Sequence, residues 1–138
     1  MATAAGYSDA PLAKKLGFKE GYRVRISHSP KNYLKLVSPH PTPILISKAI
    51  RTDIDIWHFF TDSALQLRQE LSKMQDAINQ DGMIWVSWPK KASKVATDVT
   101  EDVVRREALS MKLVDVKVCA VDEVWSSLKL VIRKNLRS

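Results

Sequence analysis

The chain has 138 residues, 45% of them hydrophobic and 27% charged, which is typical of one globular domain with a single core. Its net charge of +7 is spread along the chain: residues 1–69 carry ten basic and five acidic residues, and residues 70–138 carry twelve and ten. Nucleic-acid-binding domains usually gather basic residues on one face or helix, so the spread favours an ordinary basic surface over such an interface. No apolar run approaches the roughly 20 residues that span a membrane.

The N-terminal sequence and the cysteine content both bear on the cellular compartment of the protein. The N-terminal sequence lacks the long apolar core of a secretory signal, and the single cysteine, Cys119, excludes an internal disulfide and fits a reducing environment. We therefore expect a cytoplasmic protein with no membrane partner. Residues 1–8 have the composition of a loose leader, and no linker or repeat divides the remainder, so residues 1–138 are predicted to form one domain.

Turn and cap residues divide the chain into alternating helices and strands. Residues Pro11 to Leu16, followed by Gly17, predict a short first helix. Apolar, β-branched and aromatic runs predict strands at 22–27, 44–47, 54–60, 83–88, 113–121 and 127–133. Apolar residues at helical spacing and helix-start signals predict further helices at 30–36, 63–80 and 101–111.

Polar residues are expected at the helix ends. Ser29 is the predicted cap of the helix at 30–36, and Thr61 or Asp62 that of the helix at 63–80. Asp81-Gly82 is expected to end that longer helix, and Thr100 to cap the last one.

The order of elements predicts an α/β fold, a three-layer Rossmann-like sandwich with a mostly parallel sheet. The last two strands are joined by a link far too short for a parallel crossover, so the C-terminal strand must be antiparallel. This closing strand resembles the arrangement of class I methyltransferases, in a shortened form. Between Ser47 and Ile54 there is no room for a crossover helix, so either the link crosses compactly or the two strands form a hairpin.

In sheets of this class, ligands bind beyond the carboxyl ends of the strands. We expect a ligand site at this rim, made by His28, Ser29, Asp62, Trp88, Lys90, Lys91 and Asp122. Ser29 would offer a helix N-terminus to an anion, the two lysines positive charge, and Trp88 a stacking surface. Trp88 could equally be a tryptophan at the solvent edge, and the bond to Pro89 has a raised chance of being cis.

Several kinds of site are disfavoured. The segment after the first strand, Ser27 to Tyr33, has no glycine to bring the backbone against a cofactor, and Ser47-Lys48 stands where a ribose-binding acid would end the second strand. The three histidines show no spacing typical of metal ligands, and His58 is predicted to be a hydrogen-bonded structural residue. We expect no metal, no cofactor and no catalytic constellation.

Two further groups of chemically reactive side chains have simpler explanations. Cys119 has no obvious histidine partner and is predicted to be a small core residue. Asp98, Glu101 and Asp102 lie at the start of a helix, where capping accounts for them better than acid–base catalysis does.

Three stretches, GYSDAPLAKKLGFKEGYRV (6–24), WVSWPKKASKVATDVTEDVVR (85–105) and LVDVKVCAVDEVWSSLKLVIRK (113–134), resemble a family of small bacterial proteins known only as a domain of unknown function. The resemblance implies a stand-alone cytoplasmic domain and supplies no chemistry. We expect a non-catalytic binding domain for a small anionic ligand or a protein partner. The alternatives are a divergent S-adenosylmethionine-dependent methyltransferase and a weak nucleic-acid-binding protein.

Overall fold

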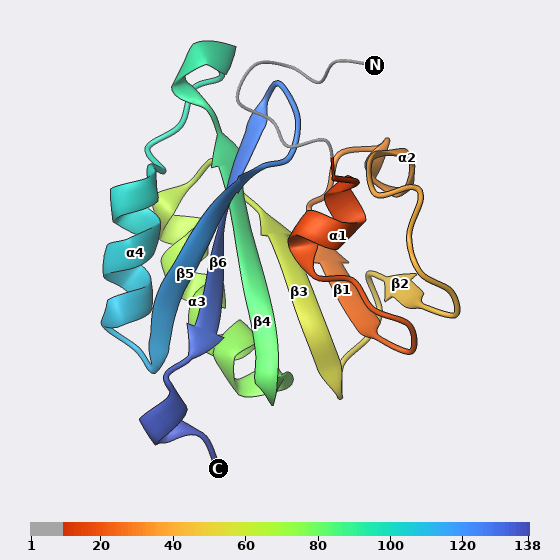
Figure 1. The fold of residues 1–138 in the computed structure, drawn as a ribbon. Helices are drawn as coiled ribbons and strands as arrows, with labels where there is room; N and C mark the ends of the chain where they lie inside the picture. Colours follow the sequence, from red (N-terminus) through yellow and green to blue (C-terminus); the bar gives the residue numbers. More distant parts are fainter. Residues whose placement is uncertain (1–9) are drawn as a thin grey trace.

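The computed structural model describes residues 10–138, so the predicted leader at residues 1–8 lies outside the described residues. Six strands form one sheet in the order β2-β1-β3-β4-β6-β5 (Figure 1). The strands are β1 (Arg23–Ser27), β2 (Leu45–Ser47), β3 (Ile54–Phe60), β4 (Ile78–Pro89), β5 (Leu113–Ala120) and β6 (Trp125–Ile132). The helices are α1 (Leu12–Leu16), α2 (Tyr33–Leu36), α3 (Ala64–Ala77) and α4 (Glu101–Leu109), with 3₁₀ turns at Lys91–Ser93 and Lys134–Leu136.

The directions of the strands define a mixed sheet. β1 pairs in parallel with β2 and β3, and β3 pairs in parallel with β4. β6 runs antiparallel to both of its neighbours, β4 and β5, so β6 alone opposes the other five strands. The prediction of a mostly parallel sheet with an antiparallel C-terminal strand is therefore confirmed.

The short link from β2 to β3 crosses compactly and does not form a hairpin. β2 and β3 lie on opposite sides of β1 and are both parallel to it, so the link must pass over β1. Two β1 side chains hold the link: Arg23 Nε donates to the Thr52 carbonyl at 3.2 Å, and Arg25 Nη1 donates to the Ile50 carbonyl at 2.7 Å. Six residues therefore make a connection for which parallel sheets usually use a crossover helix.

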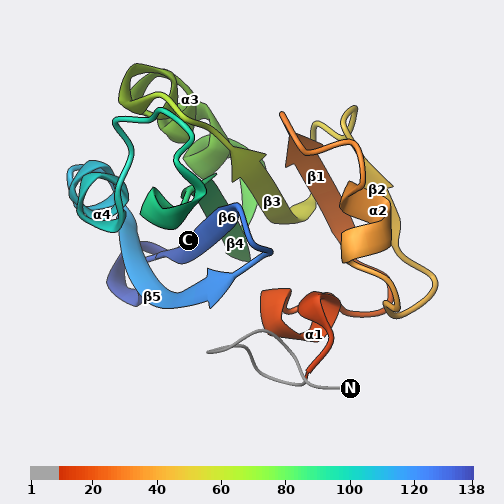
Figure 2. The ribbon, with the colours of Figure 1, turned by 90° about the horizontal axis from the view of Figure 1, so that it is seen from above.

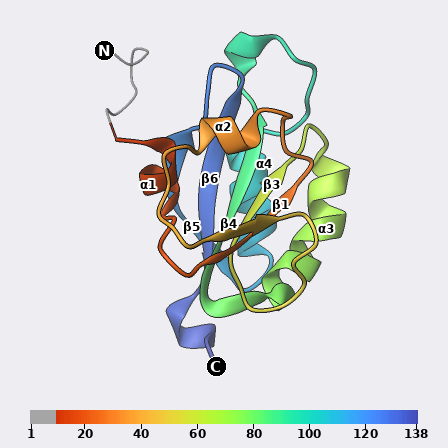
Figure 3. The same cartoon turned by 90° about the vertical axis from the view of Figure 1, so that its right-hand side faces the viewer.

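Helices pack against both faces of the sheet, with α1 on one side and α3 on the other in Figure 3. The larger core lies between the sheet and the helices α3 and α4, and includes Leu71, Met74, Val104, Ile84 and Leu130. The smaller core lies between the sheet and the helices α1 and α2, and includes Ala13, Leu16, Val24, Ile26 and Tyr33. In the middle of the sheet, neighbouring residues of a strand face opposite cores: Ile84 and Val86 of β4 lie in the larger core and Trp85 lies in the smaller one.

The junction between α3 and β4 differs from the prediction. Helix α3 ends at Ala77 and the strand begins at once with Ile78, so Asp81-Gly82 lies inside β4 and does not end the helix. A Cβ at Gly82 would lie 3.0 Å from the carbonyl oxygens of Asp55 and Asn79. Glycine is therefore required by the close approach of β3, at a point where the β3–β4 register shifts.

The helix caps were predicted in part. Thr100 caps α4 as expected, and its side chain accepts a hydrogen bond from Val103 N. Ser63, and not Thr61 or Asp62, caps α3 by accepting from Gln66 N at 3.1 Å. No helix among residues 10–138 is long and apolar enough to cross a bilayer.

Candidate binding cleft at the carboxyl edge of the sheet

The predicted rim residues all lie at one edge of the sheet but do not form one site. His28 and Ser29 follow β1, Asp62 follows β3, and Lys90 follows β4, whose parallel directions bring these ends to the same edge. His28 and Ser29 line a cavity of about 600 Å³. Trp88 and Lys91 line a second cavity of about 490 Å³, and Asp62, Lys90 and Asp122 line neither.

The first cavity continues into a smaller one of about 360 Å³ on the same face of the sheet, because Arg25, Lys48, Trp57 and Lys73 line both. We call the two together the basic cleft, and its further lining residues are Ile26, Ser27, His28, Ser29, Ala49, Arg51, Glu70 and Ala77. It contains four cationic side chains and one carboxylate, a net charge of +3 with His28 neutral.

The basic cleft forms because the β2–β3 link is too short to contain a helix that would cover β1. Figure 2 shows α3 beside β3, and among residues 10–138 no helix lies over the same face of β1 and β2. Side chains of β1 that a crossover helix would bury, Arg25 and Ser27, are instead partly exposed and line the cleft. The face of β1 that no helix covers therefore forms a polar hollow, which extends from the middle of the strand to its carboxyl end.

One wall of the cleft is held rigidly by Arg25 and Trp57. The Arg25 guanidinium carbon lies 4.5 Å from the centroid of the Trp57 ring, a cation–π distance. Nη1 of Arg25 donates to the Ile50 carbonyl, and the Trp57 indole N–H donates to Ser27 Oγ at 2.8 Å. Arg25 Nε is buried and has no hydrogen-bond partner among the described residues. The wall thus presents a guanidinium that is held in one orientation.

The other lining residues add mobile charge and one strained residue. Lys73 pairs with Glu70 at 3.5 Å, and its side chain is 74% exposed. His28 is exposed and adopts a left-handed φ of 56°, with its ring edge-on to Phe59 at a centroid distance of 5.6 Å. A positive φ is uncommon outside glycine, although histidine adopts it more often than most residues.

Ser29 does not have the predicted role. Helix α2 begins at Tyr33, Asn32 precedes it without a side-chain cap, and the helix has only four residues. The expectation that Ser29 presents a helix N-terminus to an anion is therefore wrong, because the turn at Ser29 to Lys31 is not helical. Ser29 still lines the basic cleft.

Trp88 is a core residue whose edge reaches the second cavity. It is 7% exposed and packs in the core between the sheet and helices α3 and α4, so the solvent-edge alternative is wrong. The cis peptide bonds among the described residues precede Pro39 and Pro43, and the bond from Trp88 to Pro89 is not one of them. The loop after β4 returns to the sheet edge, because Lys90 N donates to the Val124 carbonyl at 2.7 Å.

The carboxylates near α4 are structural, as predicted. Asp98 Oδ1 accepts from Ala64 N at 2.7 Å, so it binds the N-terminus of α3 from a neighbouring loop. Glu101 and Asp102 both pair with Arg105 on their own helix. Among residues 10–138, no three histidine, cysteine or acidic side chains gather where they could hold a metal ion.

His58 lies on the other face of the sheet, in a buried chain of hydrogen bonds. Its Nε2 lies 2.6 Å from Ser87 Oγ and its Nδ1 lies 2.8 Å from the Tyr33 hydroxyl. Ser87 donates to Ser127 Oγ, and Ser127 donates to the Val86 carbonyl. Since each hydroxyl has one hydrogen, Ser87 must accept from His58 Nε2–H, and the Nδ1 atom must accept from Tyr33.

Burial fixes the protonation states along this chain. Desolvation lowers the pKa of His58 to about 3 and raises the pKa of the Tyr33 hydroxyl. His58 is fully buried and its ring stacks on Phe60 at 4.3 Å. The prediction of a hydrogen-bonded structural histidine is confirmed. Cys119 is also buried, as expected, and desolvation raises the pKa of its thiol.

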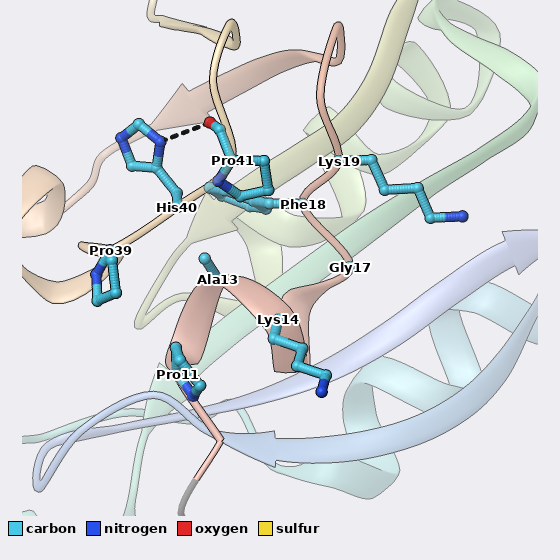
Figure 4. A pocket seen from close by; sticks show the side chains of 9 residues that line it. All are labelled: Pro11, Ala13, Lys14, Gly17, Phe18, Lys19, Pro39, His40 and Pro41. Atoms are coloured by element: carbon cyan, nitrogen blue, oxygen red, sulfur yellow. Dashed lines mark hydrogen bonds between the residues drawn. The ribbon is translucent and has the colours of Figure 1, made fainter.

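A third cavity, of about 440 Å³, lies between α1 and the proline-rich segment before β2. Ala13, Phe18, Pro39 and Pro41 make most of its wall, and Figure 4 shows the Lys14 and Lys19 side chains pointing away from the prolines. His40 Nδ1–H donates to the Pro41 carbonyl at 2.9 Å, so the histidine is engaged locally. This hollow is apolar and offers no convergent polar groups.

Sequence reasoning missed the basic cleft. Arg25, Lys48, Trp57 and Lys73 come from three strands or strand ends and from α3, and no local pattern connects them. One signal was available: a link too short for a helix leaves one face of β1 open, and Arg25 is charged at a position that should otherwise be buried.

Similarity to known proteins is limited to the fold. No protein-family model and no curated protein matches the sequence, so the resemblance to a small bacterial family stays a prediction. A cysteine-to-alanine variant of LepI in complex with SAH and substrate analogue is similar over 88% of this chain, with a TM-score of 0.53 and 10% identity. LepI in complex with SAM gives the same values. The match covers 39% of LepI, so this mixed α/β chain shares the fold of about two fifths of SAM-binding LepI.

Proposed function

We propose that this chain is a shortened Rossmann-like domain of the methyltransferase type, a three-layer sandwich that binds a small anionic ligand in the basic cleft without catalysing a reaction. The observation that carries the proposal is the position of the cleft. His28 and Ser29, which follow β1, line a cavity of about 600 Å³, within the range of small-molecule sites.

The strand order supports this position for a ligand. From β1 the chain moves to β2 on one side, and β3 then lies on the opposite side of β1. In open α/β sheets the ligand crevice lies at such a reversal, outside the carboxyl ends of the strands. The basic cleft reaches the carboxyl end of β1 through Ser27, His28 and Ser29, and it borders the middle of β3 through Trp57.

The charge of the cleft supports an anion. Four cations face one carboxylate there, and low-dielectric walls strengthen the attraction of a bound anion over its value in water. The expectation that Asp62, Trp88, Lys90, Lys91 and Asp122 contact the same ligand stays a prediction, and these residues lie outside the lining of the basic cleft.

A divergent S-adenosylmethionine-dependent enzyme is the second candidate, favoured by the fold shared with LepI in its SAM and SAH complexes. Two features count against it. The turn after β1 lacks glycine and has His28 at its left-handed position, and Lys48 follows β2 where an acid would bind ribose hydroxyls.

Tryptophan indole signals in a ¹H–¹⁵N spectrum can test the proposal. A panel of nucleotides, sugar phosphates and small organic carboxylates should contain at least one compound that shifts the Trp57 indole and the His28 and Ser29 amides, and SAM and SAH are added to test the second candidate. The Trp85 indole, which donates to the Leu16 carbonyl in the opposite core, is the internal control and should not move. Absence of such shifts across the panel would count against the proposal.

The same spectra separate the alternatives. Saturable binding of SAM at the cleft would favour the enzyme candidate. Binding of an oligonucleotide with affinity that falls steeply with salt would favour a nucleic-acid-binding protein, because counterion release dominates such complexes.

A further inference from the structure

We infer that the ligand of the basic cleft carries a phosphate group, seated among Arg25, Lys48 and Lys73. The inference rests on the proposed function and names the chemical class that the cleft selects. The three side chains line both parts of the cleft, so one group placed at their junction can contact all of them.

The first reason is the state of Arg25. Stacking on Trp57 and the bond to the Ile50 carbonyl fix its guanidinium before any ligand arrives. Its Nε is buried and closed to solvent, so a ligand has to reach the guanidinium through its other N–H groups. A guanidinium held in one orientation matches the oxygens of a phosphate, and little entropy is lost on binding.

The second reason is Lys48. It comes directly after β2, the strand end where dinucleotide-binding folds place an acid for the ribose hydroxyls, or a cation for a phosphate. Lys48 is exposed and lines both parts of the cleft, so its ammonium can reach the space in front of Arg25. A lysine at this position therefore favours a ligand with a phosphate group over one that offers only the uncharged hydroxyls of a ribose.

The third reason is the balance of charge. Glu70 is the one carboxylate in the lining and pairs with Lys73, which leaves a cationic excess. A phosphate monoester carries a charge between about −1.5 and −2 near pH 7 and three acceptor oxygens, so it can satisfy one guanidinium and two ammonium groups together. A cationic sulfonium such as that of SAM would be repelled.

Ser27 adds a fourth polar group to the proposed phosphate site, beside Arg25, Lys48 and Lys73. Ser27 Oγ accepts the Trp57 indole N–H at 2.8 Å, so its own hydrogen is directed by that bond and can donate to a ligand oxygen. Ser27 is half-buried and lines the cleft.

The test compares AMP, adenosine and inorganic phosphate by calorimetry and by the Trp57 indole signal, at constant ionic strength. We expect AMP to bind at least about 10-fold more tightly than adenosine, and inorganic phosphate to compete with AMP. Lys48→Ala and Lys73→Ala should each weaken AMP binding by about 5- to 20-fold without changing adenosine binding. Lys35→Ala, an exposed lysine on α2, is the matched control and should leave AMP binding unchanged.

Other results would overturn the inference. Equal binding of AMP and adenosine at the cleft would exclude a phosphate seat, and binding of a carboxylate from the panel would then leave the proposed function standing. No binding of AMP or phosphate at millimolar concentration would also exclude it, and the ligand panel then decides the proposed function separately. AMP binding that Lys48→Ala and Lys73→Ala leave unchanged would place the phosphate elsewhere.

Discussion

The polar side chains on the two faces of β1 and β3 differ in their burial and in their hydrogen-bond partners. On the face toward α1 and α2, His58 and its three hydroxyl partners are buried and joined in one hydrogen-bonded chain. On the face toward α3, the cationic side chains that line the basic cleft outnumber the carboxylates and are at least partly exposed. The polar groups of the first face thus have their partners within the protein, whereas the cations of the second face are open to solvent.

The largest expected effect concerns the pH dependence of stability. The pKa of His58 is about 3 when folded and 6.5 when unfolded, so between these values the unfolded chain binds more protons. Stability contributed by the neutral ring is therefore complete above pH 6.5 and falls as the pH is lowered toward 3, by about 1.4 kcal/mol per unit. Urea unfolding at several pH values should show this slope in the natural protein and lose it in His58→Gln.

The control for this prediction uses the natural protein alone. An NMR pH titration should show that the His58 ring stays neutral down to about pH 4. Protonation of His58 near its ordinary pKa, or parallel urea curves for the two proteins, would contradict the account of the buried chain.

A smaller loss is expected when the chain of hydrogen bonds is broken at its centre. His58→Ala removes a fully buried ring and leaves the Tyr33 and Ser87 hydroxyls without their partner. The expected decrease in the free energy of unfolding at pH 7 is about 3 kcal/mol. The measurement is chemical denaturation followed by tryptophan fluorescence.

His28→Asn is the matched control on the other face. His28 is exposed, and asparagine tolerates the left-handed backbone, so the free energy of unfolding should change by no more than about 0.5 kcal/mol. Similar losses for the two histidines would show that the faces do not differ as described.

The sequence predicted the sheet much better than it predicted the site. The strands and their directions follow from local patterns and from link lengths, and the short link after β5 requires the reversal of β6. The basic cleft depends on which strands become neighbours: Lys48 and Trp57 meet only because β2 and β3 flank β1. The burial of Trp88 was missed for a similar reason, since its cover comes from α3 and α4, which are distant in the sequence.

The smallest effect on stability is expected in the cleft, together with a large effect on binding. Lys48→Glu lowers the net charge of the cleft from +3 to +1 and relieves repulsion among exposed groups, so stability should stay the same or rise by up to about 0.5 kcal/mol. AMP affinity should fall by at least about 10-fold, because a carboxylate then faces the phosphate. Lys35→Glu, with the same charge change on α2, should leave AMP affinity unchanged. If Lys48→Glu instead destabilised the fold by more than about 2 kcal/mol, Lys48 would belong with His58 among the residues that hold the protein together, and the contrast between the two faces would fail.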